Sequence, residues 1–362
     1  MKIFNNKWDI GWGITSQCNM NCEFCYSKSA RNGEEDITLK RLIKFIDNNN
    51  DKIASINFGT GENSLLDDWF TLIAYIKQTY PTISIAVTTN GFLGHIANKK
   101  DRYKKIIKEC INEIDVSLDF ANQLKHNNIR GNPNAFNWVL ETLKLASDIS
   151  ITTTIVFIGL EETLMFDNIH KLFKIAKDYG AFVRLNIYRP TNPNIKPPPI
   201  KIIYNALDEI ISTYQVVSLA DPLFSALFSD RTSIDASGYN SLRILPDGSI
   251  TPSTYLVQKE WKAGHIFEEN ILEKIRERIQ FINIKNIIPV ACKDCNLLKR
   301  CKGGAKDRRI LTFGNLNEKD PLCDYHNKDL KIKSKAVYTE STGTPHIHDG
   351  YLPTLIFSSN KI

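Results

Sequence analysis

Three cysteines near the start of the chain have a spacing that suits an iron–sulfur cluster. Cys18, Cys22 and Cys25 follow the pattern C-x3-C-x2-C in the run Thr15-Ser-Gln-Cys-Asn-Met-Asn-Cys-Glu-Phe-Cys-Tyr26. Three thiolates on one short loop can bind three irons of a 4Fe–4S cluster and leave the fourth iron without a protein ligand. An open coordination position is typical of catalytic metal sites, whereas structural sites are closed. A zinc site would need a fourth ligand close by, and the nearest histidine, His95, lies far downstream.

A second group of cysteines lies near the C-terminus. Its four members are Cys292, Cys295, Cys301 and Cys323. Four thiolates can close either a zinc site or a 4Fe–4S cluster, and the spacing by itself favours zinc. The remaining cysteine, Cys110, lies late in a predicted helix, so we expect it in the hydrophobic core. His346 and His348 form a His-x-His pair, which we expect at the surface rather than at a metal site.

Short apolar runs alternate with helical segments over residues 8–190, the pattern of βα units and a parallel sheet. The predicted strands are Ile10–Thr15, Ala54–Phe58, Ile83–Thr88, Ile114–Leu118, Ile151–Phe157 and Phe182–Tyr188. The stretches between them are amphipathic; Leu39, Leu42 and Ile46, for example, share one helical face. Such units predict a partial (β/α) barrel, in which chemistry gathers at the carboxyl ends of the strands. The first cysteine loop follows the first strand and so lies at that end.

Five prolines between Arg189 and Ile200 predict a stiff, extended linker and a domain boundary. A helix over Ile203–Ile211 and a strand-and-turn pattern over Leu242–Thr251 follow. We therefore expect four parts: a barrel over residues 1–190, a Pro-rich linker and helical connection over 191–240, a smaller domain over 241–330 and a C-terminal tail over 331–362.

Composition excludes several broad classes of protein. The chain has 362 residues, enough for a large domain with its own core and a smaller one. Its net charge of +6 is spread thinly, without the basic, aromatic-rich stripe of nucleic-acid-binding proteins. No apolar run approaches the roughly 18 residues of a membrane span, and the first residues show no apolar signal core. Eight cysteines in such a chain indicate metal binding in a reducing, cytoplasmic compartment rather than disulfides.

The first cysteine loop resembles the cluster loop of radical S-adenosylmethionine (SAM) enzymes, with Phe24 at the usual aromatic position before the last cysteine. Directly after the second predicted strand comes the run Gly59-Thr-Gly-Glu-Asn63. Its glycines, Gly59 and Gly61, let the backbone approach a ligand, and Glu62 supplies a carboxylate for an ammonium group. The run resembles the Gly-Gly-Glu-Pro motif of the same family, and departs from it at a threonine and an asparagine.

The resemblance implies roles for residues at the other strand ends. Ser117 and Arg130 would bind the methionine carboxylate or the ribose hydroxyls of SAM. Gly159 and Glu162 would support its adenine. SAM would chelate the open iron, and its reductive cleavage would give methionine and a 5′-deoxyadenosyl radical that abstracts hydrogen from C–H bonds. Taken singly, each residue would fit a helix cap or a turn, so their joint order along the chain is what indicates SAM binding.

The C-terminal cysteine run resembles the extension called SPASM, found in peptide-modifying radical SAM enzymes and usually holding two auxiliary clusters. Where the family places ligands of the first auxiliary cluster, this chain has Ser253, Glu269 and Ala305. The four cysteines that remain match the second auxiliary cluster. We therefore expect two 4Fe–4S clusters, one catalytic and one auxiliary that conducts electrons or staples the structure. The expected fold class is α/β, a partial (β/α)6 radical SAM barrel with a smaller C-terminal SPASM/twitch-like auxiliary-cluster domain.

The resemblance runs from about Asp9 to Asp324 and implies a maturase of ribosomally made peptides. The fragments Asn57-Phe-Gly-Thr-Gly-Glu-Asn63 and Asn186-Ile-Tyr-Arg-Pro190 look most like enzymes acting on precursors with nitrile-hydratase-like leaders. We expect hydrogen abstraction that leads to excision of a tyrosine-derived unit or to a side-chain cross-link. Epimerisation ranks lower, because epimerases of this kind generally need a free cysteine and Cys110 alone is free. The sequence identifies no catalytic residue.

The implied partners are a precursor peptide with its leader and a reducing electron donor of the flavodoxin or ferredoxin type. About seventeen residues precede Cys18, too few for the winged-helix domain that often holds the leader. A separate partner protein would then hold it, or the Leu219–Asp230 stretch or the C-terminal tail would bind it as an added strand. Two alternatives stay open: the same chemistry on a sugar or other small molecule, and a zinc-bearing binding module or scaffold without catalysis.

Overall fold

One sheet organises the part of the chain that the structure describes. The computed structural model describes residues 7–31, 36–285, 287–325, 332–340 and 346–362. The strands are β1 (Trp8–Trp12), β2 (Ile53–Phe58), β3 (Ser84–Thr89), β4 (Glu113–Ser117), β5 (Thr152–Gly159), β6 (Phe182–Ile187), β7 (Tyr214–Leu219), β8 (Ser241–Ile244), β9 (Ser249–Thr251), β10 (Gly264–His265) and β11 (Leu355–Lys361). Their order across the sheet is β10-β9-β8-β1-β2-β3-β4-β5-β6-β11-β7.

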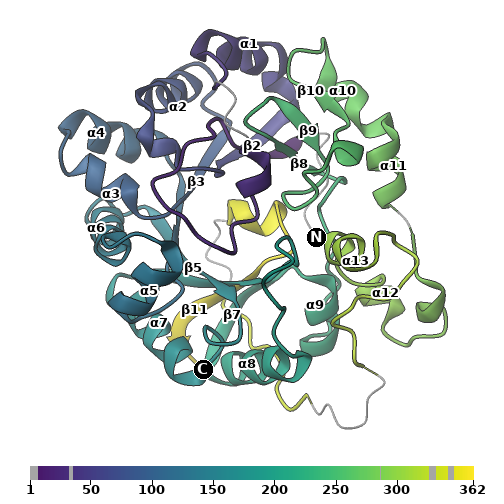
Figure 1. Cartoon of the computed structure of the whole chain (residues 1–362). Coiled ribbons are helices and arrows are strands. Elements are labelled where there is room, and N and C mark those ends of the chain that lie inside the picture. Colours follow the sequence, from purple (N-terminus) through teal and green to yellow (C-terminus); the bar gives the residue numbers. More distant parts are fainter. Residues whose placement is uncertain (1–6, 32–35, 286, 326–331, 341–345) are drawn as a thin grey trace.

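Helices alternate with the first strands and then build the C-terminal part. The α-helices of the described residues are α1 (Leu39–Asn49), α2 (Asp67–Thr79), α3 (Phe92–Ala97), α4 (Asp101–Cys110), α5 (Gln123–Arg130), α6 (Ala135–Asp148), α7 (Phe166–Asp178), α8 (Ile200–Thr213), α9 (Pro222–Phe228), α10 (Ile271–Lys274), α11 (Ile279–Lys285), α12 (Leu298–Cys301) and α13 (Lys306–Phe313). Within the described ranges, no helix has the length and apolarity to cross a membrane. Figure 1 shows the strands as an incomplete ring with α1 to α8 around its outside.

The predicted strands of residues 8–190 are confirmed, with every boundary within about three residues of its predicted place. β1 to β6 pair in chain order and are all parallel. β8 pairs parallel with the other side of β1, and β9 and β10 continue the sheet antiparallel. The carboxyl ends of the parallel strands therefore meet at one end of the ring, where the loops that follow them converge.

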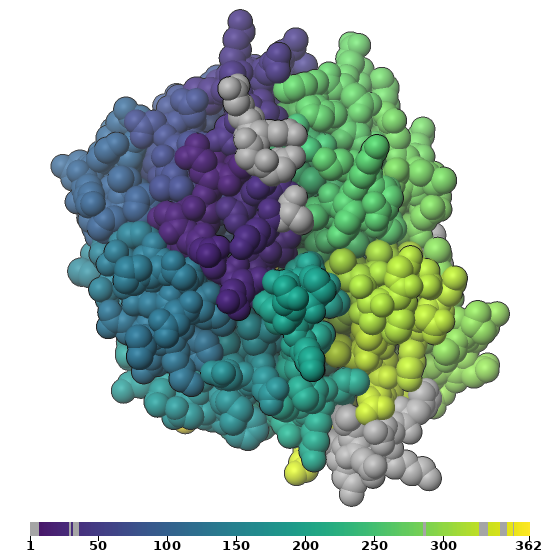
Figure 2. Space-filling model, viewed as in Figure 1, coloured from purple at the N-terminus to yellow at the C-terminus, as the bar shows by residue number. Residues whose placement is uncertain are grey.

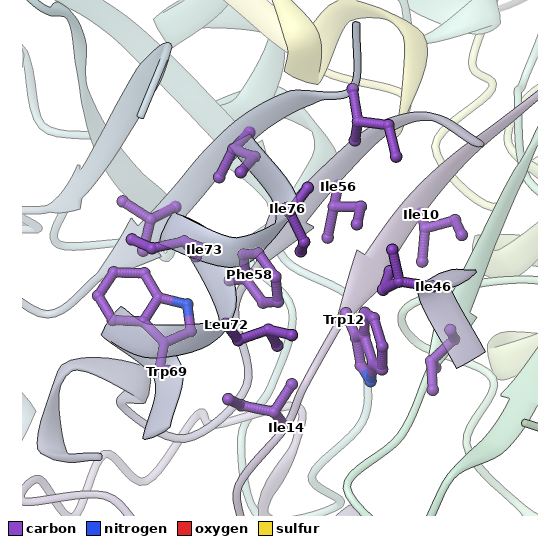
Figure 3. Close-up of a cluster of buried hydrophobic side chains, with 14 of the residues drawn as sticks. Ile10, Trp12, Ile14, Ile46, Ile56, Phe58, Trp69, Leu72, Ile73 and Ile76 are labelled. Atoms are coloured by element: carbon purple, nitrogen blue, oxygen red, sulfur yellow. The ribbon is translucent and has the colours of Figure 1, made fainter. Parts of the chain in front are cut away.

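The outward faces of the strands are apolar and pack beneath the helices. On β1 and β2 the outward residues are Ile10, Trp12, Ile56 and Phe58. Figure 3 shows the helix side chains that surround them, which are Ile46 of α1 and Trp69, Leu72, Ile73 and Ile76 of α2. The strand residues recur every second position and the helix residues every third or fourth, as these two structures require. Truncating one such side chain to Ala costs about 2–5 kcal/mol of stability.

The inward faces of the strands are small or polar. Alternate positions carry Gly11 on β1, Asn57 on β2, Asp115 on β4, Arg184 on β6 and Arg243 on β8, all of them buried. Asp115 and Arg184 form an ion pair inside the ring. Buried charges need such partners, because removing them from water is costly. The interior of the ring therefore depends on polar groups that other segments bring to it.

The C-terminal residues contribute a strand that the sequence did not predict. β11 pairs antiparallel with β6 on one side and with β7 on the other, so the expected tail extends the main sheet. Leu355, Ile356 and Phe357 are completely buried in it. Because both edges of β11 are paired, this strand has no free edge for a leader peptide, and that expectation is wrong for β11.

The Leu219–Asp230 stretch, the other segment expected to bind a leader as a strand, contains helix α9. Every residue of α9 is buried, from Pro222 at its first turn to Phe228. The Asp221 carboxylate accepts a hydrogen bond from the backbone N–H of Leu223 at 3.1 Å, a standard N-cap. A buried helix offers no strand edge, so α9 itself cannot bind a leader as an added strand.

The two histidines of the His-x-His pair lie inside the ring, so the expectation of surface histidines is wrong. Figure 1 shows the short helix η7 (Ile347–Gly350) in the middle of the ring. Nδ1 of His348 lies 2.8 Å from Glu113 Oε1, and its Nε2 lies 2.9 Å from Asp115 Oδ2. Nδ1 of His346 lies 3.5 Å from the same Glu113 oxygen. The sequence alone gives no signal for these contacts, because they join residues that are far apart in the chain.

Tyr351 continues this segment along β1. A Cβ at Gly11 would stand 1.4 Å from the Tyr351 hydroxyl oxygen, so only glycine leaves room for that hydroxyl. The hydroxyl lies 2.9 Å from Arg243 Nη1 and 2.9 Å from Thr254 Oγ1. We call residues 346–351 the C-terminal plug, because they bring polar groups to the charged interior of the ring.

The charges of the plug and of the ring stabilise one another. Burial alone would lower the pKa of His348, but the carboxylates of Asp115 and Glu113 raise it above its usual value. Burial alone would raise the pKa of Glu113, yet the neighbouring histidines hold it well below its usual range. These carboxylates favour the protonated form of His348, whose Nδ1 hydrogen-bonds to Glu113 and whose Nε2 lies within ion-pair distance of Asp115.

We expect His348→Ala to lower the free energy of unfolding by about 3–5 kcal/mol at pH 6, because two buried carboxylates lose a partner charge. The contribution of His348 is fully present below its unfolded pKa of about 6.5 and is lost as pH rises through the higher folded value. The contribution of Glu113 is present above its unfolded pKa of about 4.3 and is lost as pH falls. Urea unfolding from pH 5 to pH 9 measures the effect of His348, and extending the series down to pH 2 measures that of Glu113.

The matched control is His170→Ala. The His170 side chain is partly exposed and pairs with Glu209 at 3.0 Å, so its loss costs about 1 kcal/mol or less. Equal stability of His348→Ala and the unchanged protein at pH 6 would contradict the charged contact.

Candidate active site

The first three cysteines lie on the loop after β1, at the carboxyl end of the ring. Each sulfur has a nitrogen donor nearby. Asn90 Nδ2 lies 3.8 Å from Cys18 Sγ, and Arg130 Nη1 lies 3.9 Å from Cys22 Sγ. Arg31 Nη2 lies 3.7 Å from the third sulfur, that of Cys25. Such donors stabilise the negative charge that thiolates carry in an iron–sulfur cluster.

Burial governs the protonation of these thiols. Burial raises the pKa of Cys18 to about 11, and it also raises the pKa of Cys22. Metal binding would therefore release thiol protons, as it does at other thiolate sites. Asp36 fixes the start of the loop, since its carboxylate accepts the Thr15 hydroxyl at 2.7 Å and the Ser16 backbone N–H at 2.9 Å.

The glycine-containing run after β2 packs directly against the cysteine loop. The backbone N–H of Glu62 donates to the Gln17 carbonyl at 2.9 Å. Gly61 has a φ of +66°, and a Cβ there would stand 2.4 Å from the same Gln17 carbonyl oxygen. Glycine is required at this position on both counts. Thr60 has a φ of +146°, a conformation that favours glycine, which stands at this point in the motif that the run resembles.

Glu62 lies behind the pocket rather than on its wall. The side chain is completely buried, and its oxygens accept hydrogen bonds from Ser64 Oγ at 2.6 Å and the Asn90 backbone N–H at 2.8 Å. Both oxygens also accept the Thr89 hydroxyl, at 3.0 Å. Burial raises the pKa of Glu62, and these hydrogen bonds oppose the rise. Glu62 thus ties the end of β2 to the end of β3.

Arg130 is held beside the cysteine loop by a buried carboxylate. Asp119 Oδ2 accepts from Arg130 Nε and from Nη2, each at 2.7 Å, and Asp119 Oδ1 accepts the Ile158 backbone N–H at 3.0 Å. The guanidinium lies 5.1 Å from the centre of the Phe24 ring. Two expected site residues, Phe24 and Arg130, are therefore neighbours despite their distance in the sequence.

A single pocket collects most of the expected residues. It is lined by Phe24, Gly59, Gly61, Ser117 and Arg130 together with the three cysteines of the loop. Gly159 and Glu162 do not line it. Glu162 is exposed and lies 3.5 Å from Lys125 Nζ. The adjacent β5 residues Val156 and Ile158 face the pocket instead.

Sequence reasoning missed one side of this pocket. Its residues are Tyr26, Asn90, Asp119, Asn186, Tyr188, Arg189 and Tyr255. Three of them could have been found from their position in the sequence, because Asn90, Asp119 and Asn186 each stand at the carboxyl end of a parallel strand. In Figure 2 the N-terminal residues, in purple, cover the middle of this face, beside the C-terminal part in green.

The C-terminal cysteines gather at a second place: Cys292, Cys295 and Cys301 come from one stretch that ends with α12, and Cys323 comes from a later segment. Burial raises the pKa values of Cys292, Cys301 and Cys323, and neighbouring cysteine sulfurs raise them further. Cys292 stands at the end of η6 (Val290–Cys292) and Cys301 at the end of α12. Cys110, by contrast, is buried in the hydrophobic core, as predicted.

The spacing of the sulfurs distinguishes between zinc and a larger cluster. All eight cysteines lie in the described residues, and no three of their sulfurs lie within 4.8 Å of one another. A tetrahedral zinc site with Zn–S bonds of about 2.3 Å places its sulfurs roughly 3.8 Å apart. A 4Fe–4S cluster binds each cysteine to a different iron and so needs wider spacing. Neither cysteine group among the described residues therefore has its sulfurs at the close spacing of a preformed tetrahedral zinc site.

The residues at the expected positions of a first auxiliary cluster meet a buried ion network. Ser253 Oγ lies 3.4 Å from Asp307 Oδ2, and Asp307 Oδ1 accepts from Arg189 Nε at 3.1 Å. Ala305 is completely buried and stands two residues before Asp307. Glu269 is exposed. Arg189 also lines the pocket, so this network reaches the active-site face.

Comparison with known proteins defines the class of this chain. Residues 12–179 match the model of the Radical SAM superfamily. The chain therefore carries a radical SAM domain, and the protein is an enzyme of that superfamily, whose members bind SAM and a 4Fe–4S cluster.

Two curated proteins resemble nearly the whole chain. One is the cysteine-type anaerobic sulfatase-maturating enzyme of Clostridium novyi (strain NT), 24% identical over 91% of this chain and 96% of that protein. The other is the AdoMet-dependent heme synthase of Methanosarcina barkeri (strain Fusaro / DSM 804), 25% identical over 87% of this chain and 96% of that protein.

A solved structure shows the same fold. Streptococcus suis SuiB bound to the precursor peptide SuiA superposes with a TM-score of 0.66, at 15% identity, over 87% of this chain and 75% of SuiB. The α/β fold with a parallel-dominated sheet, expected from the sequence, is confirmed.

We expect Asp119→Asn to lower the free energy of unfolding by about 3–5 kcal/mol, because Arg130 would keep a buried charge without its carboxylate. Thermal and urea unfolding measure this cost. The control is Asp167→Asn, whose exposed carboxylate lies 2.7 Å from Lys171 Nζ and contributes about 0.5 kcal/mol or less. Similar stabilities of the two variants would show that the Asp119–Arg130 pair is not needed for folding.

Proposed function

We propose that this protein is a radical SAM peptide maturase with one catalytic and one auxiliary 4Fe–4S cluster. The observation that carries the proposal is that Cys18, Cys22 and Cys25 line one pocket together, with no other cysteine and no histidine among the described residues that line it. Three thiolates with a free coordination position suit a cluster that binds SAM at its open iron.

The pocket residues suit SAM. Gly59 and Gly61 present backbone rather than side chain to the pocket, and Ser117 and Arg130 offer a hydroxyl and a cation for the carboxylate or ribose. Asn90 and Arg31 would orient the cluster through its sulfurs. Glu62 would hold the loop in place from behind. With cluster and SAM bound, this site would supply a 5′-deoxyadenosyl radical that abstracts hydrogen from the substrate.

The four C-terminal cysteines would bind the auxiliary cluster. Four thiolates leave no open iron, so this cluster would carry electrons or staple the C-terminal part rather than bind substrate. A small acidic redox protein of the flavodoxin or ferredoxin type would supply the electrons. Leader recognition would fall to a separate protein, since neither α9 nor β11 offers a free strand edge.

Peptide substrates are supported by similarity to the sulfatase-maturating enzyme and by the fold shared with SuiB. Excision of a tyrosine-derived unit or a cross-link fits this pocket better than epimerisation. Epimerisation needs a cysteine to return hydrogen, and the cysteines that line the pocket are those expected to bind iron. The similarity to a heme synthase supports a second candidate, the same radical chemistry on a small molecule.

We expect the triple change Cys18→Ala, Cys22→Ala and Cys25→Ala to halve the iron content, from about eight to about four irons per chain. Production of 5′-deoxyadenosine from SAM should be lost completely. Anaerobic reconstitution, iron and sulfide analysis and chromatography of the product test this. Cys110→Ala is the control and should keep both clusters. Zinc instead of iron in the reconstituted protein would sink the proposal.

The reaction is tested by co-expressing the chain with a neighbouring small open reading frame and measuring the mass of the peptide product. Loss of two hydrogens would identify a cross-link, and a larger loss would identify excision. Deuterium uptake from solvent without other change would identify epimerisation. An unchanged peptide, from enzyme shown to cleave SAM, would favour the small-molecule alternative.

A further inference from the structure

One side of the pocket is not used by the proposed contacts to the cluster and SAM. Its walls come from three separate parts of the fold: Tyr26 follows the last cysteine of the loop, Tyr188 and Arg189 follow β6, and Tyr255 follows β9. A substrate held opposite the cofactor would have to contact this side. Its chemistry therefore bears on what the substrate is.

Tyr255 lines this side of the pocket. The ring is fixed between the Tyr26 ring, edge-on at 5.4 Å, and the Arg189 guanidinium at 5.4 Å. Within the described residues no hydrogen bond involves the Tyr255 hydroxyl, whereas that of Tyr188 donates to the Asn192 carbonyl at 3.3 Å. Burial raises the pKa of Tyr255 to about 12, so at neutral pH it is a phenol with a proton to donate.

The cations that line this pocket already have partners. Arg130 pairs with Asp119 at 2.7 Å, and Arg189 pairs with Asp307 at 3.1 Å. Arg31 lies beside the Cys25 sulfur, one of the expected cluster ligands. Asp119 is the one carboxylate among the described residues that lines the pocket, and it forms an ion pair with Arg130.

Arg243 differs from these cations. It lies on β8 and is 1% exposed, and its Nη1 bonds to the Tyr351 hydroxyl at 2.9 Å. Its Nε and Nη2 have no hydrogen-bond partner, and no carboxylate of the described residues forms an ion pair with it. The same Tyr351 hydroxyl lies 2.9 Å from Thr254 Oγ1, so Arg243 lies behind the segment that carries Tyr255 into the pocket wall. A buried cation without a counter-charge is costly, and a bound anion nearby would offset that cost.

We propose that the side of the pocket formed by Tyr26, Arg189 and Tyr255 is a subsite for a carboxylate of the substrate. The Tyr255 hydroxyl donates a hydrogen bond to the carboxylate, and the charge of Arg243, behind the wall, balances it. This assignment rests on the proposed function, because it names the substrate chemistry of the same pocket. The carboxylate belongs either to an acidic side chain of the peptide or to the C-terminus of the peptide.

Small blocked amino acids distinguish these two sources. N-acetyl-glutamate N-methylamide is compared with N-acetyl-glutamine N-methylamide, and N-acetyl-glycine with N-acetyl-glycine N-methylamide. Each is titrated into anaerobic holoenzyme with SAM, and the dissociation constant is taken from the broadening of ligand NMR lines. We expect at least one acid to bind about tenfold more tightly than its amide, since hydrogen bonds to charged acceptors are stronger. The pair that shows the preference identifies the source.

Two substitutions test whether the preference for acids over amides arises at this subsite. Tyr255→Phe removes the donor and Arg243→Gln removes the charge, and each should bring the acid-to-amide ratio close to one. The matched controls are Tyr75→Phe, whose hydroxyl bonds to Asp47 at 2.7 Å, and Arg278→Gln, which pairs with Glu268 at 2.7 Å. Both controls lie on exposed pairs and should keep the ratio of the unchanged protein.

The melting temperature distinguishes a role of Arg243 in the carboxylate subsite from a purely structural role. Removing an uncompensated buried cation should leave the melting temperature of Arg243→Gln unchanged or raise it. A lower melting temperature with an unchanged acid-to-amide ratio would overturn the proposal, as would equal binding of acids and amides to the unchanged protein. Formation of 5′-deoxyadenosine is measured on every sample. Its absence in the unchanged protein would count against the proposed function, whereas its presence without any acid preference would count against the subsite alone.

Discussion

The parallel register of β1 to β6 is the constraint on which the rest of the structure depends. Parallel strands place all their carboxyl ends at one end of the ring, so the loops that follow β1, β2, β3 and β4 must converge there. This convergence brings Cys18 within reach of Asn90, and Cys22 within reach of Arg130. The fine fit then depends on close backbone contact, as at Gly61, where a side chain would collide with the cysteine loop.

The same strands create a second requirement inside the ring. Side chains alternate between the two faces of a strand, so apolar residues that pack beneath the helices leave polar and charged residues pointing inward. The C-terminal plug meets this requirement with His348, which pairs with Glu113 and Asp115. In this way the end of the chain becomes part of the barrel, and β11 joins the sheet beside β6. Among the described residues, Arg243 is an inward cation without a carboxylate partner.

The C-terminal part contains a buried ion network beside Ser253, one of the positions where the resemblance would place a cluster ligand. Ser253, Glu269 and Ala305 stand at positions where the resemblance would place cysteines. The buried pair of Arg189 and Asp307 contacts Ser253, and the buried Ala305 stands two residues before Asp307. A buried ion pair is stable only with further hydrogen bonds, and the neighbouring Arg308 contributes more, through Asp221 at 2.9 Å. The network also holds Arg189 against Tyr255, and both side chains line the pocket.

The sequence by itself determined the strands, the α/β class, the three-cysteine loop and the superfamily, because these depend on local periodicity and on spacing within short segments. Phe24, Gly59, Gly61, Ser117 and Arg130 were likewise found from their places after predicted strands, and the structure puts them in one pocket. Gly159 and Glu162 were placed by the same reasoning but lie outside it, since a loop residue next to a strand end can point away from the site. Tertiary structure alone decided that β11 would enter the sheet, that His348 would be buried and that Arg189 and Tyr255 would meet. Those contacts join residues far apart in the chain, and burial of charge and pairing of backbone groups across such distances leave no pattern in the local sequence.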